Sequence, residues 1–582
     1  MRFPVLALAA FCGLTSVAAA QQAADAVAPE AASARAKAEA RPVLAQDWMV
    51  VAAHPLASRA GADVLAAGGT AADAMVAVQA VLGLVEPQSS GLGGGAFLLW
   101  HDGETGAITT LDGRETAPLA ATPRLFQDAA GAPLAFFEAV VGGRSVGTPG
   151  TPALMAEAHR RWGRSDWAVL LDPAIRLAEA GFAVSPRLAT LVAGDAERLA
   201  LHPDTAAYFL PAGKPLAAGD TLHNPAYAAT LRVLATQGAD GFYTGSVADS
   251  IVTAVQGAAD NPGVLDKVDL AIYRVKEREA VCAPYRVWQV CGMGPPSSGA
   301  LAVGQILGLL RGHDLTALGP DNPESWRLIG DASRLAFADR GRYVADTDFV
   351  PVPVQGMLDP SYLQGRAALL LGDDALPEVS PGTPAFDHTL LWADGPTLEQ
   401  PATTHISIVD SYGNVLSMTS TIENAFGSRV MAGGFLLNNE LTDFSFRSHD
   451  GGVPIANRVE PGKRPRSSMA PTIVYRDGAP VLAIGSPGGS SIIGYVTQAL
   501  IAHLDWGLDV QQAVGMGHAL NRFGVYDLEE GTSAEALAAP LQAMGYEVKI
   551  GPQTSGLHAI AIGADGLQGG ADPRREGLAL GN

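Results

Sequence analysis

The sequence predicts a large mixed α/β protein, and three observations point to that class. Helical and strand-like hydrophobic patterns alternate along most of the chain. Short strand patterns then gather into a compact sheet from residue 404 onwards. The 582 residues are 48% hydrophobic and 17% charged, so they can bury one large core or two to three ordinary ones. This composition excludes a disordered chain, a coiled coil and a collagen-like repeat.

The charge balance argues against two classes of partner. Lys and Arg number 38 and Asp and Glu number 59, which gives a net charge of −21 with histidine neutral. An acidic surface repels phosphate backbones and anionic lipid headgroups. We therefore expect no nucleic-acid partner and no binding to a membrane surface. Three cysteines and 12 scattered histidines predict no metal site, and no cofactor motif stands out.

The N-terminus has the pattern of a secretory signal over residues 1–20. A short apolar run, Val5–Val17, is followed by small residues up to Ala20. This run is shorter than the ~20 residues that span a bilayer. A lipoprotein signal at Cys12 is the alternative, although a bulky Phe11 precedes this cysteine. We expect a periplasmic or secreted mature protein without a membrane span.

The first elements of the mature chain follow an alanine-rich stretch. Residues 21–42 lack an apolar face, so we expect a flexible leader. Leu56–Leu65 has helical periodicity, and Ala71–Val85 is apolar on all sides, which predicts a buried helix. The glycine-rich Gly91–Gly95 leads into the strand Ala96–His101; it could cradle a phosphate, but a tight packing turn is favoured because it opens a strand. Further helical stretches cover Thr151 to about Ala258, Ala300–Leu310 and Glu324–Val344.

Two cysteines flank a predicted hairpin in the middle of the chain. Cys282 and Cys291 lie on either side of β-rich residues and a proline-containing turn. An oxidising compartment would permit a disulfide between them. Two small buried residues fit the sequence equally well, because strand register cannot be derived from it.

The amino-acid composition of the chain changes near Gly372. Residues 372–400 are rich in Pro, Gly and Asp with weak periodicity, which indicates an exposed linker. Immediately afterwards, Thr404–Val409 and Val415–Thr421 alternate apolar and polar residues around a Gly-Asn turn, which predicts a β-hairpin. More strands are expected at Gly434–Leu437, Thr472–Tyr475 and Val481–Ile484, and a helix at Ile493–His503.

The residues that could carry chemistry lie in this second half. The hydroxyl of Thr403 is a poor nucleophile without a base, but cutting the chain before it would free an α-amine with a pKa near 8. Gly485–Ser491, between a strand and a helix, could offer backbone amides to an oxyanion, or could be a plain turn. Ser467 and Ser468, between two prolines, could hold a carboxylate or simply complete a turn.

Together these segments resemble the γ-glutamyltransferase family of N-terminal-nucleophile hydrolases. The resemblance runs through most of the mature chain. It is carried by Leu111–Pro118, Ser145–Gly150, Pro295–Gly299, Phe337–Arg340, Thr403–Ser407, Leu436–Phe444, Lys463–Met469, Gly485–Ser490 and Gly570–Arg574.

The resemblance implies one precursor that cuts itself between Ala402 and Thr403. The products would be a large subunit, residues 43–402 after the leader, and a small catalytic subunit, residues 403–582, which stay together as a heterodimer. The implied fold is a four-layer αββα sandwich with Thr403 at the start of a central strand.

The resemblance also implies the reaction and the roles of the site residues. Thr403 would attack a small γ-glutamyl compound such as glutathione and pass the acyl group to water or to an amino acid or peptide. Thr421 would position its amine, and the amides of Gly488 and Gly489 would bind the oxyanion. Arg114, Ser467 and Ser468 would bind the substrate's α-carboxylate, and Asp443, Glu423 and Glu440 its α-ammonium.

Three departures and three alternatives accompany this hypothesis. Residues 444–466 contain no Tyr or Trp where several bacterial relatives carry an aromatic gate, and Gly515–Tyr526 and Gly556–His558 match poorly. The alternatives are a glutaryl-cephalosporin-type acylase, a poly-γ-glutamate hydrolase or transferase, and an inactive binding protein on the same fold. The presence of Asp443 argues against the acylase, which has less use for an ammonium-binding carboxylate.

Overall fold

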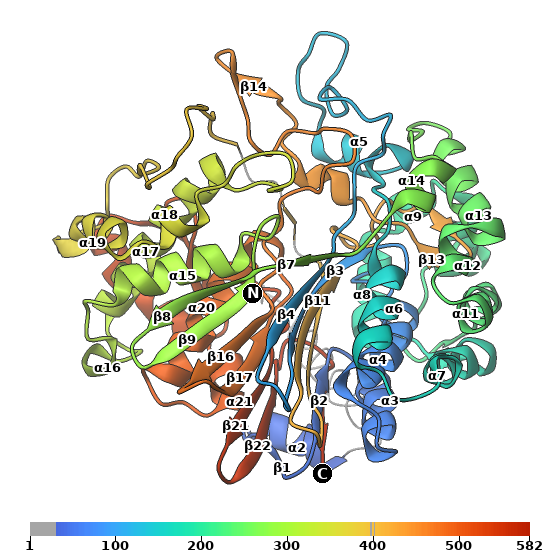
Figure 1. Ribbon diagram of the computed structural model, residues 1–582, viewed down its shortest axis with the longest axis horizontal. Helices are drawn as coiled ribbons and strands as arrows, with labels where there is room; N and C mark the ends of the chain where they lie inside the picture. The colour runs from blue at the N-terminus through green and yellow to red at the C-terminus, as the bar shows by residue number, and fades with distance from the viewer. Residues whose placement is uncertain (1–30, 396–398, 401) are drawn as a thin grey trace, which may run out of the picture.

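The computed structural model describes residues 31–395, 399–400 and 402–582, and two seven-stranded sheets lie at its centre (Figure 1). Sheet A has the strand order β1 (Val43–Ala45), β22 (Gly566–Ala571), β21 (His558–Gly563), β17 (Ala479–Gly485), β16 (Thr472–Arg476), β9 (Trp288–Met293) and β8 (Ala280–Tyr285). Sheet B has the order β23 (Leu578–Gly581), β2 (Met49–Ala52), β10 (Thr404–Val409), β11 (Val415–Thr421), β3 (Gly95–His101), β4 (Ile108–Gly113) and β7 (Lys276–Arg278).

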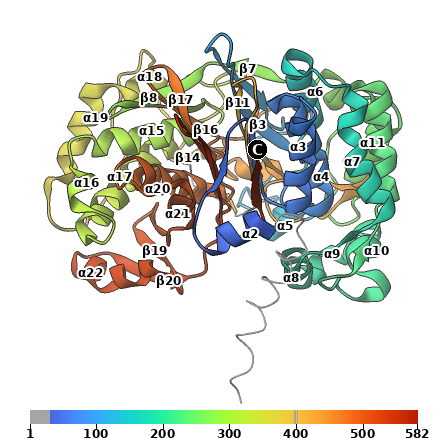
Figure 2. The same cartoon turned by 90° about the horizontal axis from the view of Figure 1, so that it is seen from below.

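Helices cover the outer face of each sheet, and Figure 2 shows the resulting layers side by side. The helices against sheet B include α3 (Pro55–Ala66), α4 (Ala71–Val85) and α6 (Thr151–Trp162), and α7 (Trp167–Ala180) packs on α4 and on α11 (Pro225–Gln237). Those against sheet A include α15 (Gly299–Leu310), α20 (Ile492–Leu504) and α21 (Val510–Gly515), and α17 (Pro323–Tyr343) packs on α15. The predicted four-layer αββα sandwich is confirmed.

Smaller elements surround these layers. The helical region after α7 continues with α8 (Pro186–Gly194), α9 (Ala196–Leu199), α10 (Pro203–Phe209), α12 (Asp240–Tyr243) and α13 (Gly245–Gln256). The short strands include the pairs β12 (Met431–Ala432) with β13 (Phe435–Leu436), and β14 (His449–Asp450) with β15 (Val453–Pro454). A third small sheet contains β18 (Ala519–Asn521), β19 (Val525–Glu529) and β20 (Glu547–Gly551).

The β10–β11 hairpin has the bounds that the sequence predicts. Successive side chains of a strand point to opposite faces of its sheet. In β10, Ile406 and Ile408 pack into the core beneath the helices of sheet B. Ser407 instead points to sheet A, where its hydroxyl donates to the carbonyl of His558 at 3.2 Å. The odd-numbered residues of β10 therefore face the space between the sheets.

The glycine-rich turn before β3 is a close-packed turn. A Cβ on Gly93 would lie 2.1 Å from the carbonyl oxygen of Leu436, and one on Gly94 would lie 1.9 Å from that of Thr421. Side chains are excluded at both positions because two other backbone segments pass directly against them. The predicted packing turn is confirmed.

The two cysteines of the β8–β9 hairpin form a disulfide. Cys282 and Cys291 are direct partners in the antiparallel register, with their Cα atoms 4.0 Å apart. Of the two alternatives that the sequence leaves open, the bridge is the one present.

The expected flexible leader is wrong for its described part. Ala31–Ala38 form the helix α2, and the ammonium of Lys37 donates to the carbonyls of Arg575 and Gly577 at 2.5 and 3.0 Å. These contacts bury Lys37 and fix the helix to the end of the chain, although the helix has no apolar stripe. Residues 1–30, which include the predicted signal and residues 21–30 of the leader, lie outside the described residues. The linker prediction is confirmed for secondary structure, since from residue 372 to 395 no helix or strand is described, but not for exposure throughout, because Trp392 and Glu399 are buried.

In the part of the chain that the structure describes, no helix combines the length and the apolar character needed to cross a bilayer. The same residues contain no group of three or more His, Cys, Asp or Glu side chains arranged to hold a metal ion.

We expect Gly94→Ala to lower the free energy of unfolding by about 1–3 kcal/mol, since the new methyl group must push the end of β11 away. Chemical denaturation measures this effect. Gly365→Ala is the matched control, because no atom lies within 4 Å of a Cβ at Gly365. Equal stability of both variants would contradict the packing argument.

Candidate active site

Thr403 lies between the two sheets, directly before β10. Its hydroxyl is buried and donates to the hydroxyl oxygen of Thr421 at 3.0 Å. The hairpin register explains this contact, because Thr404 pairs with Ser420, and one residue further out Thr403 lies opposite Thr421. The backbone amide of Glu423 donates to the same Thr421 oxygen at 2.8 Å. Thr421 is therefore held from both sides.

The backbone at Thr403 is strained. Its φ is 102°, a region that β-branched residues rarely adopt. Such a conformation costs on the order of 1–3 kcal/mol and persists only where the surroundings hold it. Two donors do so here. The amide of Gly488 donates to the Ala402 carbonyl at 3.3 Å, and the Arg575 guanidinium donates to the Thr403 carbonyl at 3.0 Å.

The loop after β17 brings Gly488 and Gly489 against this segment. Both glycines have positive φ, 138° and 57°. A Cβ on Gly489 would also lie only 2.6 Å from the carbonyl oxygen of Gln400. Glycine is thus required both by conformation and by the close approach of the chain before Thr403.

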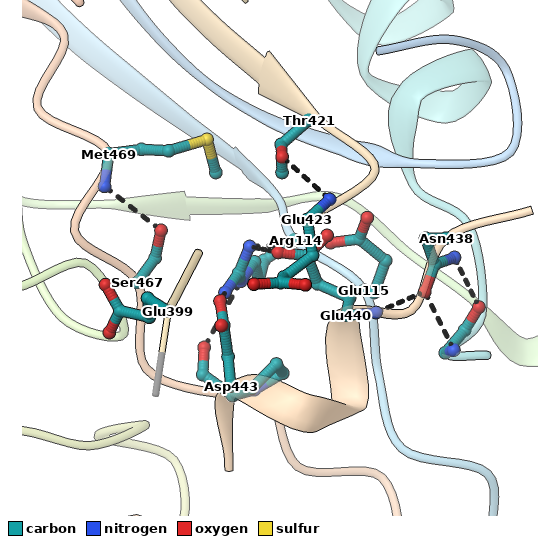
Figure 3. Close-up of polar contacts among 12 residues, drawn as sticks. Arg114, Glu115, Glu399, Thr421, Glu423, Asn438, Glu440, Asp443, Ser467 and Met469 are labelled. Atoms are coloured by element: carbon teal, nitrogen blue, oxygen red, sulfur yellow. Dashed lines mark hydrogen bonds and ion pairs between the residues drawn. The ribbon is translucent and has the colours of Figure 1, made fainter. Parts of the chain in front are cut away.

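A buried cluster of charges forms one wall of the site (Figure 3). Arg114, at the end of β4, is fully buried; its Nη1 donates to Glu440, and its Nη2 to Asp443 at 2.5 Å. Both carboxylates come from one short 3₁₀ turn, Glu440–Asp443. Glu115 lies 3.9 Å from the same guanidinium. One cation therefore faces three carboxylates.

Asn438 fixes the turn that carries these carboxylates. Its side-chain oxygen accepts from the amides of Gly147 at 2.9 Å and Glu440 at 3.0 Å. Its amide donates to the carbonyls of Gly93 at 2.7 Å and Gly147 at 2.9 Å. Figure 3 shows Asn438 and its contact with Glu440 beside the cluster. The acidic turn is thereby tied to two segments that precede Thr403 by more than 250 residues.

The cluster carries more negative than positive groups, and its carboxyls are correspondingly hard to ionise. Burial raises the pKa of Glu440 and of Asp443 well above their ordinary values, against the pull of Arg114. Burial and the nearby Asp443 raise the pKa of Glu423 in the same direction. Among the described residues, Oδ1 of Asp443 and Oε2 of Glu440 accept no hydrogen bond. A second cation, such as an ammonium group, would satisfy both atoms.

The segment before β16 contacts this cluster, because Arg114 donates to the carbonyls of Pro465 at 3.2 Å and Arg466 at 3.0 Å, and it presents two serines. The Ser467 hydroxyl accepts from the amide of Met469 at 3.1 Å. The Ser468 hydroxyl donates to the carboxylate of Glu399 and accepts from Nη2 of Arg340 at 2.7 Å. Arg340 comes from α17, and it also donates to Glu399.

One small cavity joins the predicted residues. Its volume is about 20 Å³, whereas sites for small ligands usually measure ~300 Å³ or more. Nine of the ten predicted catalytic and binding residues line it, and Gly488 is adjacent through its contact with Ala402. The lining also includes Glu399, Gln400, Met469 and Ile492. Glu399 and Gln400, from the chain before Thr403, thus form part of its wall.

Several residues of the site were missed by sequence reasoning. The sequence places Glu399 in a predicted linker and Arg340 in a motif for which no role is predicted. It predicts no role for Glu115 or Arg575. The one available signal was their position, since Glu115, Arg340 and Arg575 lie in or directly beside the segments that carry the family resemblance. Their contacts depend on segments far apart in sequence.

The sequence model of the protein family "Gamma-glutamyltranspeptidase" matches residues 57–582, and this match decides the family of the chain. The chain belongs to the gamma-glutamyltranspeptidase family. It is an enzyme of this type, with the fold of the N-terminal-nucleophile hydrolases.

Two curated relatives and one solved structure illustrate this membership. The glutathione hydrolase proenzyme of Bacillus subtilis (strain 168) is 38% identical over 550 residues, which covers 92% of each chain. The acylase ACY 1 proenzyme of Pseudomonas sp. (strain SE83) is 36% identical and covers 92% of this chain and 93% of its own. The cephalosporin acylase structure from Bacillus halodurans aligns with a TM-score of 0.82 at 27% identity, over 93% of this chain and 97% of that one.

The Glu115 carboxyl gives the site a testable pH dependence. Burial raises its pKa from 4.5 to about 7, against the pull of Arg114. The folded state then binds the proton more tightly than the unfolded state, so this contribution to stability is complete below pH 4.5 and is lost as the pH rises through 7. In a chain that carries Thr403→Ala, the free energy of unfolding should be lower at pH 8 than at pH 5. We expect Glu115→Gln to make this difference smaller by up to about 3 kcal/mol.

Denaturation curves at several pH values measure this fall. Glu378→Gln serves as control, because Glu378 is an exposed carboxylate of the linker. Parallel pH curves for Glu115→Gln and its parent would show that Glu115 ionises normally in the folded protein.

Proposed function

We propose that this protein is a self-processing γ-glutamyltransferase and glutathione hydrolase, whose nucleophile is Thr403. The observation that carries the proposal is the convergence of three features on one cavity. These are the Thr403 hydroxyl, the amides of a glycine pair beside the Ala402–Thr403 bond, and a buried acidic cluster around Arg114. The names of the relatives support the same activity, since several are glutathione hydrolase proenzymes.

The first reaction acts on the chain itself. The Thr403 Oγ attacks the Ala402 carbonyl carbon while its proton passes to the Thr403 nitrogen, and the C–N bond breaks. Water then hydrolyses the resulting ester, which leaves a carboxylate on Ala402 and a free amine on Thr403. The Gly488 amide stabilises the oxyanion, a contribution worth roughly 3–4 kcal/mol per donor in comparable sites. The strained φ of Thr403 favours cleavage, because the cut releases it.

The second reaction uses the amine that the first one frees. With a pKa near 8, this amine accepts the Thr403 proton when the hydroxyl attacks the γ-carbonyl of the donor. The amides of Gly488 and Gly489 bind the oxyanion, and Thr421 holds the nucleophile in place. The γ-glutamyl ester is then transferred to water or to the amine of an amino acid or peptide. Two half-reactions of this kind give ping-pong kinetics.

Donor recognition follows from the charges on the walls. The unsatisfied oxygens of Asp443 and Glu440, with Glu423 beside them, form the site for the α-ammonium group. We assign the α-carboxylate to Arg114, Ser467 and Ser468, which line the cavity. In the uncut chain the Arg114 guanidinium donates to Glu440, Asp443 and the carbonyls of Pro465 and Arg466.

A cephalosporin-type acylase is the second candidate, because acylases occur among the relatives and the solved structures. Its glutaryl donor lacks the ammonium group. The surplus of buried carboxylates favours the γ-glutamyl donor, since a glutaryl group would leave Asp443 and Glu440 unsatisfied.

The two-chain state and export belong to the same proposal. Cleavage gives a heterodimer of residues 21–402 and 403–582, held together by β10 and β11 inside sheet B. The signal pattern of residues 1–20 supports export to the periplasm or the medium.

The purified protein should run as two bands on a denaturing gel. The full 582 residues weigh 59.9 kDa, so the 180 residues from 403 onwards should run at about 19 kDa. N-terminal sequencing of this band should give Thr-Thr-His, and Thr403→Ala should remain a single chain. An intact wild-type chain would remove the proposed base and favour the binding-protein hypothesis.

Asp443→Asn tests donor choice. We expect kcat/KM for γ-glutamyl-p-nitroanilide to fall at least ~30-fold, since the ammonium loses a buried charged partner. The value for glutaryl-p-nitroanilide, which has no ammonium, should change little. Rates are expressed per processed subunit, measured on a gel. An equal loss for both donors would mean that Asp443 supports the fold and not the ammonium group.

A further inference from the structure

Glu399 is a buried charge at the end of a largely exposed linker. Its Oε1 accepts from Nη2 of Arg340 and its Oε2 accepts from the hydroxyl of Ser468. Arg340 is fully buried, and its Nε also donates to the hydroxyl of Ser298 at 2.7 Å. One oxygen of Glu399 thus contacts Ser468, which lines the active-site cavity, and the other contacts Arg340 of α17.

The surroundings of Glu399 are built for an anion. Two buried guanidinium groups, those of Arg340 and Arg466, lie next to each other, and Nη1 of Arg466 donates to the carbonyl of Arg340 at 3.2 Å. Burial opposes ionisation of Glu399, but the two cations and the Ser468 hydroxyl outweigh it, so that its pKa is lowered. Burial and the nearby Arg340 lower the pKa of Arg466 to about 9. Without an anion, these cations would repel each other in a low-dielectric site.

Further contacts follow along the chain towards the bond to be cut. The amide of Gln400 donates to the carboxylate of Glu423 at 3.0 Å. The carbonyl of Ala402 accepts from Gly488. Glu399 is the first of these anchors, and its two contacts are made by its side chain.

We infer that Glu399 is a positioning residue for self-cleavage, and that its carboxylate occupies the place of the substrate's α-carboxylate in the uncut chain. The inference deepens the proposed function, on which it rests, because Ser468 belongs to the proposed α-carboxylate site. It also explains why the cavity of the uncut chain measures only about 20 Å³. A donor can bind only after Glu399 has left Ser468 and Arg340.

The first test is the rate of self-cleavage, followed on denaturing gels during cell-free synthesis of the full chain. We expect Glu399→Ala to slow cleavage at least tenfold and Glu399→Gln to slow it less, since the amide keeps a hydrogen bond but loses the charge. Glu378→Ala, an exposed carboxylate of the same linker, should cleave at the wild-type rate. Added formate should restore cleavage of Glu399→Ala, whereas neutral formamide should not.

These outcomes separate the inference from the proposed function. Wild-type cleavage of Glu399→Ala, or slow cleavage that formate does not improve, overturns the positioning role. Cleavage of Thr403→Ala would overturn the proposed function instead, whatever Glu399 does.

The second test is occupancy of the carboxylate site, measured by calorimetric titration of L-glutamate. The uncut Thr403→Ala chain should bind L-glutamate at least tenfold more weakly than the Thr403→Ala, Glu399→Ala double variant. Thr403→Ala with Glu378→Ala is the matched control and should behave like the single variant. Equal affinity of the single and double variants would show that Glu399 does not occupy the substrate's place.

Discussion

The register of the β10–β11 hairpin is the constraint on which the site depends. Because Thr404 pairs with Ser420, Thr403 lies opposite Thr421, and both side chains point to the space between the sheets. A slip of one residue would turn Thr421 towards the helices, since strand side chains alternate between the two faces. Sheet A lies across this space, and its strand β17 ends where the loop with Gly488 begins. The nucleophile and the oxyanion donors therefore meet because β10 of sheet B begins at the place where β17 of sheet A ends.

The charge imbalance around Arg114 shows how a buried site can be prepared for a zwitterion. A site built only for stability would pair each buried carboxylate with a cation, because an unpaired one is costly to bury. Here Asp443 and Glu440 share a single guanidinium, and each keeps an oxygen that accepts no hydrogen bond from the described residues. Burial raises the pKa values of both carboxyls, and the attraction of the one guanidinium does not offset it. The proposed selectivity for an ammonium-bearing donor thus has a physical basis in the charges of the protein itself.

Much of this architecture could be predicted from the sequence, but the anchors of the precursor could not. The hairpin has the predicted bounds because alternation and a Gly-Asn turn are local signals. Glu399 gave no such signal, since its burial depends on Arg340 from a helix about 60 residues earlier and Ser468 from a loop about 70 residues later. The leader was mispredicted for the same reason, because Lys37 is held by carbonyls at the other end of the chain.

The intact chain also dictates the order of events. The groups that serve the donor reaction are already in contact with the chain's own backbone: Gly488 with the Ala402 carbonyl, and Glu423 with the amide of Gln400. A donor and this segment cannot use the same groups at once. The base for the donor reaction does not exist until the Ala402–Thr403 bond is cut, since the Thr403 nitrogen is an amide before that. Under the proposed mechanism, activity is therefore withheld twice, by an occupied pocket and by a missing amine, and cleavage of the Ala402–Thr403 bond would supply the amine and release the segment that lines the pocket.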